Sequence, residues 1–511
     1  MKGPSRQAVL GIDGGAFFHG SRKVFSGISF LLDGAKTALV GENGVGKSTL
    51  LKCLSGELEL NGGKIVKSRD LKVGYLAQEV PEGLADLTVR QVLERSLERA
   101  GAAGEDWRID VMLDEISVAP EVAEGRFGAL SGGWQRLVLI AGAARLEAPD
   151  ILILDEPTNH LDIAAINTLE GWLDDDPLPM LIVSHDRAFL ERVSTRTLFL
   201  RADGAHAFKT SFALAREELL RRDAAAGIRR QVEEKEIKRL EAVAARYKVW
   251  GVKNSDFHKR QHATERRIDR IEATKTQIYS GRERRLELGE ADLDAKVVLR
   301  VAGLKLAAPD GRLLLTIDRL SVAAGDRIAL LGVNSAGKTT LLNAFATAFA
   351  ARSQHYDGAA DIRFNPGCRL AYFDQTLGGL PLDESLLGYL VERDGTGERD
   401  AIRVLAQAGF EFKRVREPIG LLSQGERSRL VFLKMKLSKP NLYLFDEPTS
   451  HLDIEGQEAL EAQLEETDVA CVLVSHDRWF AKAVATRFLE IRKGKLVEVE
   501  DPDVFFDAQV L

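Results

Sequence analysis

The strongest constraint in this sequence is that the chain contains two copies of one unit. The segments GENGVGKST (Gly41–Thr49) and GVNSAGKTT (Gly332–Thr340) correspond to each other. ILILDEPTNHLD returns as LYLFDEPTSHLD, and LIVSHDRAFL returns as VLVSHDRWFA. All three pairs are separated by the same 291 residues. Motifs that recur at one fixed offset predict a tandem duplication of a unit of about 200 residues.

The segment between the two copies differs from both. Residues from about 206 to 292 are rich in Arg, Lys, Glu and Ala and contain no Pro. Apolar residues at helical spacing predict one long helix over about 213–247 and a second helix that includes Ile268, Ile271 and Ile278. Gly251 and Asn254-Ser255 predict the turn between them. We therefore expect an α/β protein with domains at 1–205 and 293–511 and an α-helical hairpin, packed as an antiparallel coiled coil, at 206–292.

The first repeated motif has the pattern of a phosphate-binding loop. Each copy matches G-x-x-x-x-G-K-[ST], follows an apolar strand-like run and precedes a helical one, which is the context of a P-loop. The glycines let backbone N–H groups surround phosphate oxygens, and the helix N-terminus adds its dipole. The predicted ATP-binding residues are Gly41, Glu42, Asn43, Gly44, Val45, Gly46, Lys47, Ser48, Thr49, Gly332, Val333, Asn334, Ser335, Ala336, Gly337, Lys338, Thr339 and Thr340.

The second motif is a strand that ends in Asp-Glu. Four apolar residues precede each pair, so a buried strand would deliver the carboxylates to the edge of the sheet where ligands bind. The aspartates suit a contact to Mg²⁺ beside the P-loop hydroxyl, and the glutamates suit polarising the attacking water. Mg²⁺ is therefore the expected cofactor, with candidate metal residues Ser48, Gln78, Asp155, Thr339, Gln375 and Asp446.

The third motif places a histidine after another strand. His185 and His476 lie 138 residues past the P-loop lysines Lys47 and Lys338, which suggests contacts to the γ-phosphate. Gln78 and Gln375, each at the end of a strand-like run, are expected near Mg²⁺ and the water. The candidate catalytic residues are Glu156, Glu447, His185 and His476.

The segments LSGGWQR (Leu130–Arg136) and LSQGERSR (Leu422–Arg429) complete a resemblance. With the P-loops and the DEPT strands they are similar to the nucleotide-binding domains of ABC ATPases. In that family the signature Ser-Gly-Gly of one domain caps the γ-phosphate held by the other. The resemblance implies two shared sites with ATPase activity, formed by pairing of the two domains within a monomer. The implied signature residues are Ser131, Gly132, Gly133, Ser423, Gln424 and Gly425.

Two such domains joined by a long charged linker, without a membrane span, resemble the ABC-F proteins. The TNHLD and TSHLD sequences and the stretch Arg246–Glu272 add to this resemblance. It implies a cytoplasmic ATPase that works on the ribosome, with its linker hairpin at the tRNA exit site. Ribosome and tRNA are then the expected partners, and relief of stalled or drug-blocked translation is the expected role.

The sequence departs from that family in three places. Ser335 stands where the P-loop usually has a second glycine, and Gln424 replaces the middle signature glycine. An aromatic ring upstream of the P-loop usually stacks on adenine. Phe17 or Phe18 fits this role in the first half, but residues 280–344 contain no Phe, Tyr or Trp. Stacking on a base is worth about 1–3 kcal/mol, so we expect the second site to bind nucleotide more loosely.

The linker carries the charge of a nucleic-acid contact. Residues 216–285 have 20 Lys and Arg against 12 Asp and Glu, a net charge of +8, in a chain whose total is −7. Basic residues with interleaved aromatics gather near the predicted turn, a pattern that suits RNA backbone and exposed bases. The candidate RNA-binding residues are Lys248, Lys253, Lys259, Arg260, Arg266, Arg267 and Arg270.

Composition excludes several classes and leaves others open. Three dispersed cysteines argue against a zinc site or a disulfide framework, and no apolar run reaches the length of a membrane span or of a signal peptide. The energy-supplying subunit of a transporter remains an alternative, as does a DNA-maintenance ATPase. Leu511 lies 35 residues past His476, so we expect no C-terminal coiled coil and no DNA partner. A scaffold with inactive sites is disfavoured because Lys, Asp, Glu and His are intact in both copies.

Overall fold

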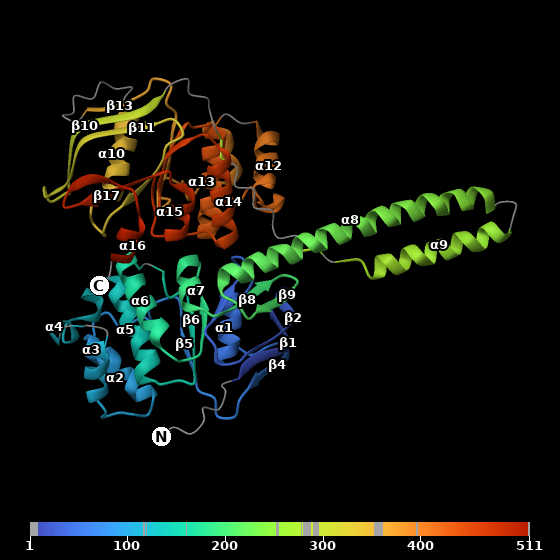
Figure 1. Cartoon of the computed structure of the whole chain (residues 1–511), viewed down its shortest axis with the longest axis horizontal. Helices are drawn as coiled ribbons and strands as arrows, with labels where there is room; N and C mark the ends of the chain where they lie inside the picture. Colours follow the sequence, from blue (N-terminus) through green and yellow to red (C-terminus); the bar gives the residue numbers. More distant parts are fainter. Residues whose placement is uncertain are drawn as a thin grey trace. The chain divides into compact units, whose positions relative to one another are not determined.

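The computed structural model describes residues 9–115, 118, 120–159, 161–251, 255–276, 278–279, 288–289, 296–351, 361–394 and 397–508 (Figure 1). The chain divides into two compact units. One unit is Met1–Ala207 together with Arg284–Leu511, and the other is Phe208–Glu283. The first unit holds both α/β domains, and the second is helical.

The first α/β domain is built from two sheets and the helices that cover them. Its strands are β1 (Leu10–His19), β2 (Arg22–Leu32), β3 (Thr37–Val40), β4 (Gly62–Lys67), β5 (Val73–Leu76), β6 (Ile151–Asp155), β7 (Met180–Val183), β8 (Arg196–Arg201) and β9 (Gly204–Phe208). Its helices are α1 (Lys47–Ser55), α2 (Val89–Arg99), α3 (Trp107–Glu115), α4 (Pro120–Ala123), α5 (Gly132–Ala141), α6 (Ile163–Asp175) and α7 (Arg187–Val193), with shorter turns η1 (Phe127–Ala129) and η2 (Gly142–Leu146).

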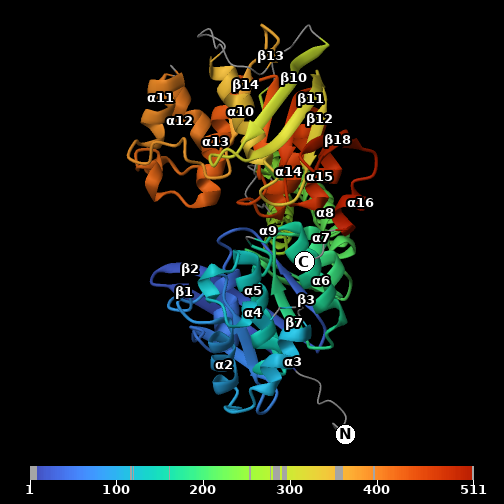
Figure 2. The ribbon, with the colours of Figure 1, turned by 90° about the vertical axis from the view of Figure 1, so that its left-hand side faces the viewer.

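The second α/β domain repeats this order of elements (Figure 2). Its strands are β10 (Val297–Ala307), β11 (Leu313–Ala323), β12 (Arg327–Leu331), β13 (Asp361–Phe364), β14 (Leu370–Phe373), β15 (Leu442–Asp446), β16 (Ala470–Val474), β17 (Arg487–Arg492) and β18 (Lys495–Val499). Its helices are α10 (Lys338–Ala351), α11 (Leu386–Asp394), α12 (Glu398–Gln407), α13 (Gln424–Ser438), α14 (Ile454–Glu466), α15 (Arg478–Val484) and α16 (Asp503–Ala508), with turns η3 (Phe412–Arg414) and η4 (Ile419–Leu421).

The main sheets of the two domains share one strand order. It is β5-β6-β7-β3-β8-β9 in the first domain and β14-β15-β16-β12-β17-β18 in the second. The central strands β6, β7 and β3 are parallel and buried along their whole length, as expected of a parallel sheet covered on both faces. In the second domain β11 also pairs with β18, at Thr316 and Lys495, so that the antiparallel strands β13, β10 and β11 continue the main sheet.

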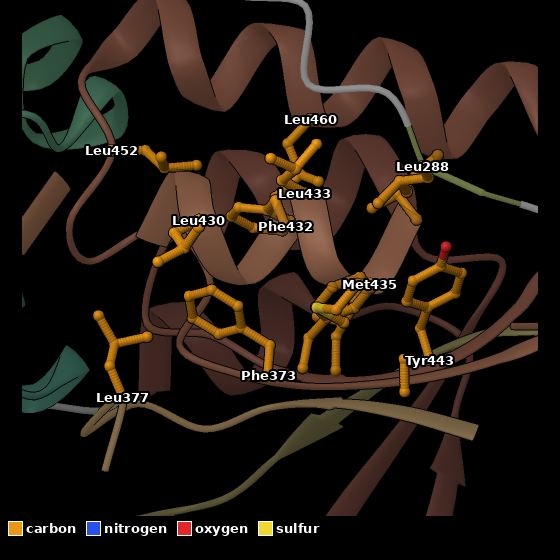
Figure 3. Packing of buried hydrophobic residues seen from close by; sticks show 14 of the residues in the cluster. Leu288, Phe373, Leu377, Leu430, Phe432, Leu433, Met435, Tyr443, Leu452 and Leu460 are labelled. Atoms are coloured by element: carbon orange, nitrogen blue, oxygen red, sulfur yellow. The ribbon is translucent and has the colours of Figure 1, made fainter. Parts of the chain in front are cut away.

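Alternate residues of one strand face two separate cores. In β15, Tyr443 and Phe445 belong to a core shared with the helical part of the domain, whereas Leu442 and Leu444 pack on the side of α10. Figure 3 shows the first core, where Phe373 and Phe432 stack with ring centroids 4.8 Å apart and Leu288 lies near Tyr443. This two-sided burial fixes the carboxyl ends of the parallel strands, where the repeated motifs lie.

The helical unit is a hairpin of α8 (Phe212–Gly251) and α9 (Ser255–Ala273). The two helices pack on each other, and Arg267 and Glu236 form an ion pair of 3.3 Å between them. The predicted fold, two α/β domains with a helical hairpin between them in the sequence, is confirmed. α8 extends to Gly251, slightly beyond the predicted end, and Ile278 lies outside α9. Among the described residues, no helix is long and apolar enough to cross a membrane.

Candidate active sites

Each P-loop connects a buried strand to a helix. The first joins β3 to α1 and the second joins β12 to α10. Gly46 and Gly337 have φ angles of 104° and 97°, in the left-handed region that favours glycine. A Cβ on Gly46 would lie 2.5 Å from Val24 Cγ1, so only glycine lets the loop pass the neighbouring strand. Both loops therefore have the backbone that phosphate binding requires.

Each P-loop lysine donates hydrogen bonds to backbone carbonyl oxygens of its own loop. Lys47 Nζ donates to the carbonyl oxygens of Gly41 and Glu42 at 2.7 and 3.2 Å. Lys338 Nζ makes the equivalent bonds to Gly332 and Val333 at 2.6 and 3.1 Å, and burial lowers its pKa. Each ammonium group therefore lies beside the first residues of its own P-loop.

Ser335 gives the second P-loop a less favourable backbone conformation than the first. Its φ is 61°, and the corresponding Gly44 has a φ of 79°. A left-handed conformation costs a non-glycine residue about 1–2 kcal/mol. The second loop keeps the P-loop backbone at this cost.

The aspartates at the strand ends lie beside the P-loop hydroxyls. Thr339 Oγ1 donates to Asp446 Oδ1 at 3.2 Å, and Ser48 forms a hydrogen bond with Asp155. Burial raises the pKa of Asp155, and that of Asp446 to about 6. Asp155 Oδ1 and Asp446 Oδ2 are buried and have no hydrogen-bond partner among the described residues.

These oxygens fit Mg²⁺. A hydroxyl beside a carboxylate with a free buried oxygen is the type of ligand that Mg²⁺ prefers, with the remaining positions filled by water and phosphate. The described residues contain no group of three His, Cys, Asp or Glu that could hold a metal without such help. Gln78 and Gln375 follow β5 and β14 and are exposed, as side chains that contact a ligand would be.

Each glutamate of the Asp-Glu pair contacts its histidine. His185 Nε2 lies 3.2 Å from Glu156 Oε1, and the His185 backbone N–H donates to Glu156 Oε2 at 3.2 Å. In the second half, His476 Nε2 lies 3.6 Å from Glu447 Oε1, and its N–H donates to Oε2 at 3.0 Å. Burial raises the pKa of Glu156 to about 7, while the ammonium of Lys47 opposes the rise. A carboxylate in this position is suited to accept a proton from water.

Arg136 is a residue of the first site that the sequence reasoning did not single out. Its guanidinium donates to the carbonyl oxygens of Ala77, Gln78 and Asp155, the first and last at 2.6 and 2.7 Å. It therefore ties the glutamine segment to the end of β6. The sequence did contain a signal for Arg136: the two signature segments differ at this position, where the second has Ser428.

The two signature segments cap helices in different ways. Ser131 caps α5 and accepts a hydrogen bond from the Trp134 N–H, and Gly132 and Gly133 begin the helix. Ser423 caps α13 in a reciprocal capping box, in which its Oγ accepts from the Glu426 N–H at 3.4 Å and its own N–H donates to Glu426 Oε2 at 2.9 Å. Gln424 occupies the first helical position and is exposed. Both serines stand where an anion would meet a helix N-terminus.

The second signature lies near the first P-loop. The Asn43 N–H donates to Asp453 Oδ2 at 2.8 Å. A Cβ on Gly425 would lie 3.9 Å from Asn43 Nδ2. In the reverse direction, burial lowers the pKa of Lys338 and the carboxylate of Asp162 in the first half opposes this shift. The structure thus brings Gly425 close to the opposite P-loop.

The two phenylalanines proposed for adenine differ in exposure. Phe17 packs on Phe25 with ring centroids 6.1 Å apart, and Phe25 flanks Gly46 of the P-loop. Phe18 is 40% exposed. In the second half, Leu314 lies against Gly337. Phe18 is therefore the better placed of the two rings to meet a base.

The hairpin end near Gly251 and Ser255 carries both charge and aromatic rings. Tyr247 and Trp250 pack on Phe257, with ring centroids 5.9 and 5.7 Å apart. Lys253 lies outside the described residues. The six other candidate RNA-binding residues are all exposed: Lys248, Lys259, Arg260, Arg266, Arg267 and Arg270. We call this group, with the three aromatic rings, the hairpin tip.

Comparison with known proteins agrees with the fold. The family model for the ABC transporter matches residues 26–159 and 315–450. "ABC transporter F family member 5" of Arabidopsis thaliana is 28% identical over 96% of this chain and 77% of its own. "ATP-binding protein Uup" of Escherichia coli K12 is 31% identical over 89% of this chain and 75% of its own.

Two solved structures share the fold. "RNase-L Inhibitor" has a TM-score of 0.60 at 18% identity, covering 95% of this chain and 90% of its own. A "Model of ribosome-bound archaeal Pelota and ABCE1" has a TM-score of 0.57 at 18% identity, covering 95% and 78%. At this identity the likeness shows the fold alone.

The fold and the duplicated motifs define a tandem P-loop ATPase with two ATP-binding, ATP-hydrolysing domains. The chain belongs to the ABC transporter family, and within it to the ABC-F proteins. The predicted family and enzyme class are confirmed. Domains of this family generally use Mg²⁺ with ATP.

Proposed function

We propose that each ATP site is shared between the halves and that the residues predicted from the sequence carry the reaction. Residues 1–205 and 293–511 are the two nucleotide-binding domains, and 206–292 is the linker. The first site combines the P-loop at Gly41–Thr49 with Ser423, Gln424 and Gly425. The second combines the P-loop at Gly332–Thr340 with Ser131, Gly132 and Gly133. The short separation of Gly425 and Asn43 supports this pairing.

In the reaction, the glutamate accepts a proton from the attacking water and the histidine keeps the glutamate in place. Glu156 accepts a hydrogen bond from the backbone N–H of His185, and Glu447 accepts one from the backbone N–H of His476. The two histidine rings lie 3.2 and 3.6 Å, respectively, from the other oxygen of the same carboxylate. Lys47 and Lys338 bind the β- and γ-phosphates. Mg²⁺ would be held by Ser48, Asp155 and Gln78, and by their counterparts Thr339, Asp446 and Gln375, and would neutralise phosphate charge.

We further propose that the protein acts in the cytoplasm as a monomer, bound to the ribosome through the hairpin tip. The observation that carries this proposal is the set of exposed cations on the last turn of α8 and along α9, with three aromatic rings beside the turn between them, in a chain of net charge −7. Cations supply affinity for phosphate, and rings stack on exposed bases. Ribosomal RNA and tRNA at the exit site are the expected contacts. Relief of stalled or drug-blocked translation is the expected outcome, and one structural neighbour is itself described as ribosome-bound.

The test is ribosome co-sedimentation of the Glu156→Gln/Glu447→Gln variant, with and without ATP. A protein that binds ATP without hydrolysing it should remain closed, so it should sediment with ribosomes only when ATP is present. Charge reversal at Lys259, Arg260, Arg266 and Arg267 should then abolish sedimentation.

The matched control reverses four exposed cations elsewhere on the same unit: Arg221, Arg222, Arg229 and Lys235. These changes alter the net charge equally and should leave sedimentation nearly intact. If the glutamine variant binds ATP but stays in the supernatant, the ribosome proposal fails. Co-purification with membranes would then favour a transporter subunit, and retention on duplex DNA a DNA-maintenance ATPase.

A further inference from the structure

Helix α14 of the second domain contacts the segment around His185 in the first domain. Arg187 Nη1 donates to Glu461 Oε2 at 3.1 Å, and Nη2 donates to the other oxygen of the same carboxylate. One turn earlier on α14, Gln457 Nε2 donates to the backbone carbonyl oxygen of His185 at 3.3 Å. Positions four apart lie on one face of a helix, so two side chains of α14 contact the residues on either side of Asp186, one through the His185 carbonyl and one through the Arg187 side chain.

Helix α6 of the first domain contacts the segment around His476 in the second domain in a related way. Arg478 pairs with Glu170 through both guanidinium nitrogens, one of them at 3.1 Å, and also donates to Asn167 Oδ1 at 2.9 Å. Glu170 and Glu461 are separated by the repeat offset, as are Arg187 and Arg478. The two ion pairs are therefore copies of one feature of the ancestral unit.

The contact of Gln457 has no copy. The residue at the corresponding position of α6 is Ile166, whose side chain cannot donate a hydrogen bond. Gln457 is 3% exposed, so a polar side chain has been buried at this place in one half only. A buried amide is costly unless it is hydrogen-bonded, and the bond that it makes is to the backbone of His185.

That backbone leads directly to the proposed base. The N–H of His185 donates to Glu156 Oε2, and the ring of the same residue lies 3.2 Å from Oε1. A displacement of the His185 backbone moves both its N–H, which is bonded to the Glu156 carboxylate, and its ring, which lies beside that carboxylate. The carbonyl held by Gln457 belongs to the same residue.

We propose that Gln457 is a positioning residue that couples the Glu156 site, and not the Glu447 site, to contact with α14 of the opposite domain. This inference rests on the proposed roles of Glu156 and His185. When the domains close, the amide of Gln457 fixes the His185 peptide and with it the carboxylate that receives the proton. The second site lacks this restraint because Ile166 replaces the amide, so hydrolysis at the two sites responds unequally to closure.

The experiment separates the sites by disabling one at a time. Gln457→Met, which keeps the length of the side chain but removes the donor, is placed in the Glu447→Gln background and in the Glu156→Gln background. Single-turnover ATP hydrolysis and ATP affinity are measured in each. We expect turnover at the Glu156 site to fall about 3- to 10-fold, the value of one neutral hydrogen bond, with ATP affinity unchanged. The Glu447 site should be unaffected.

A second readout is independent of turnover. Amide hydrogen exchange without nucleotide should become faster in residues 181–190 of Gln457→Met and stay constant in residues 472–481. Ile166→Met is the matched control, because it changes the counterpart without removing a hydrogen bond, and it should alter neither segment. If Gln457→Met folds poorly, Gln457→Asn, which stays polar but loses reach, replaces it.

Equal loss at both sites would overturn the inference, since it would show a general effect on packing. Unchanged exchange in residues 181–190 together with unchanged turnover would overturn it as well. Absence of hydrolysis in both parent backgrounds would instead refute the roles proposed for the glutamates. In that case the exchange experiment alone decides whether Gln457 restrains the His185 segment.

Discussion

The two ATP sites share the residues proposed for the reaction but differ in the residues around them. Lys, Asp, Glu and His are present in both. The first site adds Arg136, which ties the glutamine segment to β6, and the contact of Gln457 with His185. The second has Ser428 and Ile166 at these positions and a serine with a φ of 61° in its P-loop. The two copies have thus diverged in what supports the chemistry and have kept the chemistry itself.

This difference indicates which site is the better organised. In the first, the histidine ring is 0.4 Å closer to its glutamate, at 3.2 rather than 3.6 Å. A general base works best when its orientation is fixed before the reaction. We therefore expect the first site to carry most of the turnover, and each prediction below tests part of that comparison.

The largest effect should come from removing the bases. Glu156→Gln keeps the shape of the side chain but cannot accept a proton, so turnover at its site should fall at least about 100-fold, the lower bound for general base catalysis. Glu447→Gln should do the same at the second site. Steady-state hydrolysis of the two single variants shows the division, and we expect Glu156→Gln to remove the larger share. Equal loss of steady-state hydrolysis in the two single variants would contradict the expectation that the first site carries most of the turnover.

The buried ion pairs between the halves should be next in size. Arg187→Met leaves the carboxylate of Glu461 in a site where its side chain is only 13% exposed, and breaking such a pair costs about 3–5 kcal/mol. The double variant Arg187→Met/Glu461→Met removes both charges of this pair and should regain part of the loss, because Asp477, 3.7 Å from Arg187, still lacks its cation. Thermal unfolding measures both. Arg478→Met with Glu170→Met is the matched pair, and a failure of either double variant to recover would contradict a desolvation origin.

The acidity of Glu156 gives a pH-dependent effect. Its pKa is raised from 4.5 to about 7 by burial, so between these values the folded protein keeps a proton that the unfolded chain releases. The stability of the parent protein therefore falls as pH rises through this window. Glu156→Gln does not lose stability in this way. Above pH 7, its free energy of unfolding should rise relative to that of the parent by up to about 3 kcal/mol, at 1.36 kcal/mol per pKa unit. Denaturant midpoints at pH 5 and pH 8 test this, and a constant difference would contradict it.

The repeat accounts for how much could be predicted from sequence. Glycines, strand-like runs and a common offset were enough for the P-loops, the carboxylate strands and the hairpin, because each depends on local pattern. Contacts between the halves depend on which helix faces which loop. Arg187 and Glu461 are 274 residues apart, and nothing near either residue points to the other. Gln457 was missed for the same reason, and Arg136 was missed because its contacts join it to segments that are distant in the sequence of the first domain. The mismatch of each residue with its counterpart in the repeat was visible.

The smallest effect concerns adenine. Phe18→Ala should weaken ATP binding at the first site by about 1–3 kcal/mol, the value of stacking on a base. Phe17→Leu is the control, because Phe17 packs against Phe25 and a leucine keeps most of that contact. Titration of ATP into the Glu156→Gln/Glu447→Gln variant should show a tighter and a looser site, and Phe18→Ala should weaken only the tighter one. Two equal sites in the parent would mean that Leu314, beside Gly337, replaces the ring. The two halves would then differ in catalysis but not in binding.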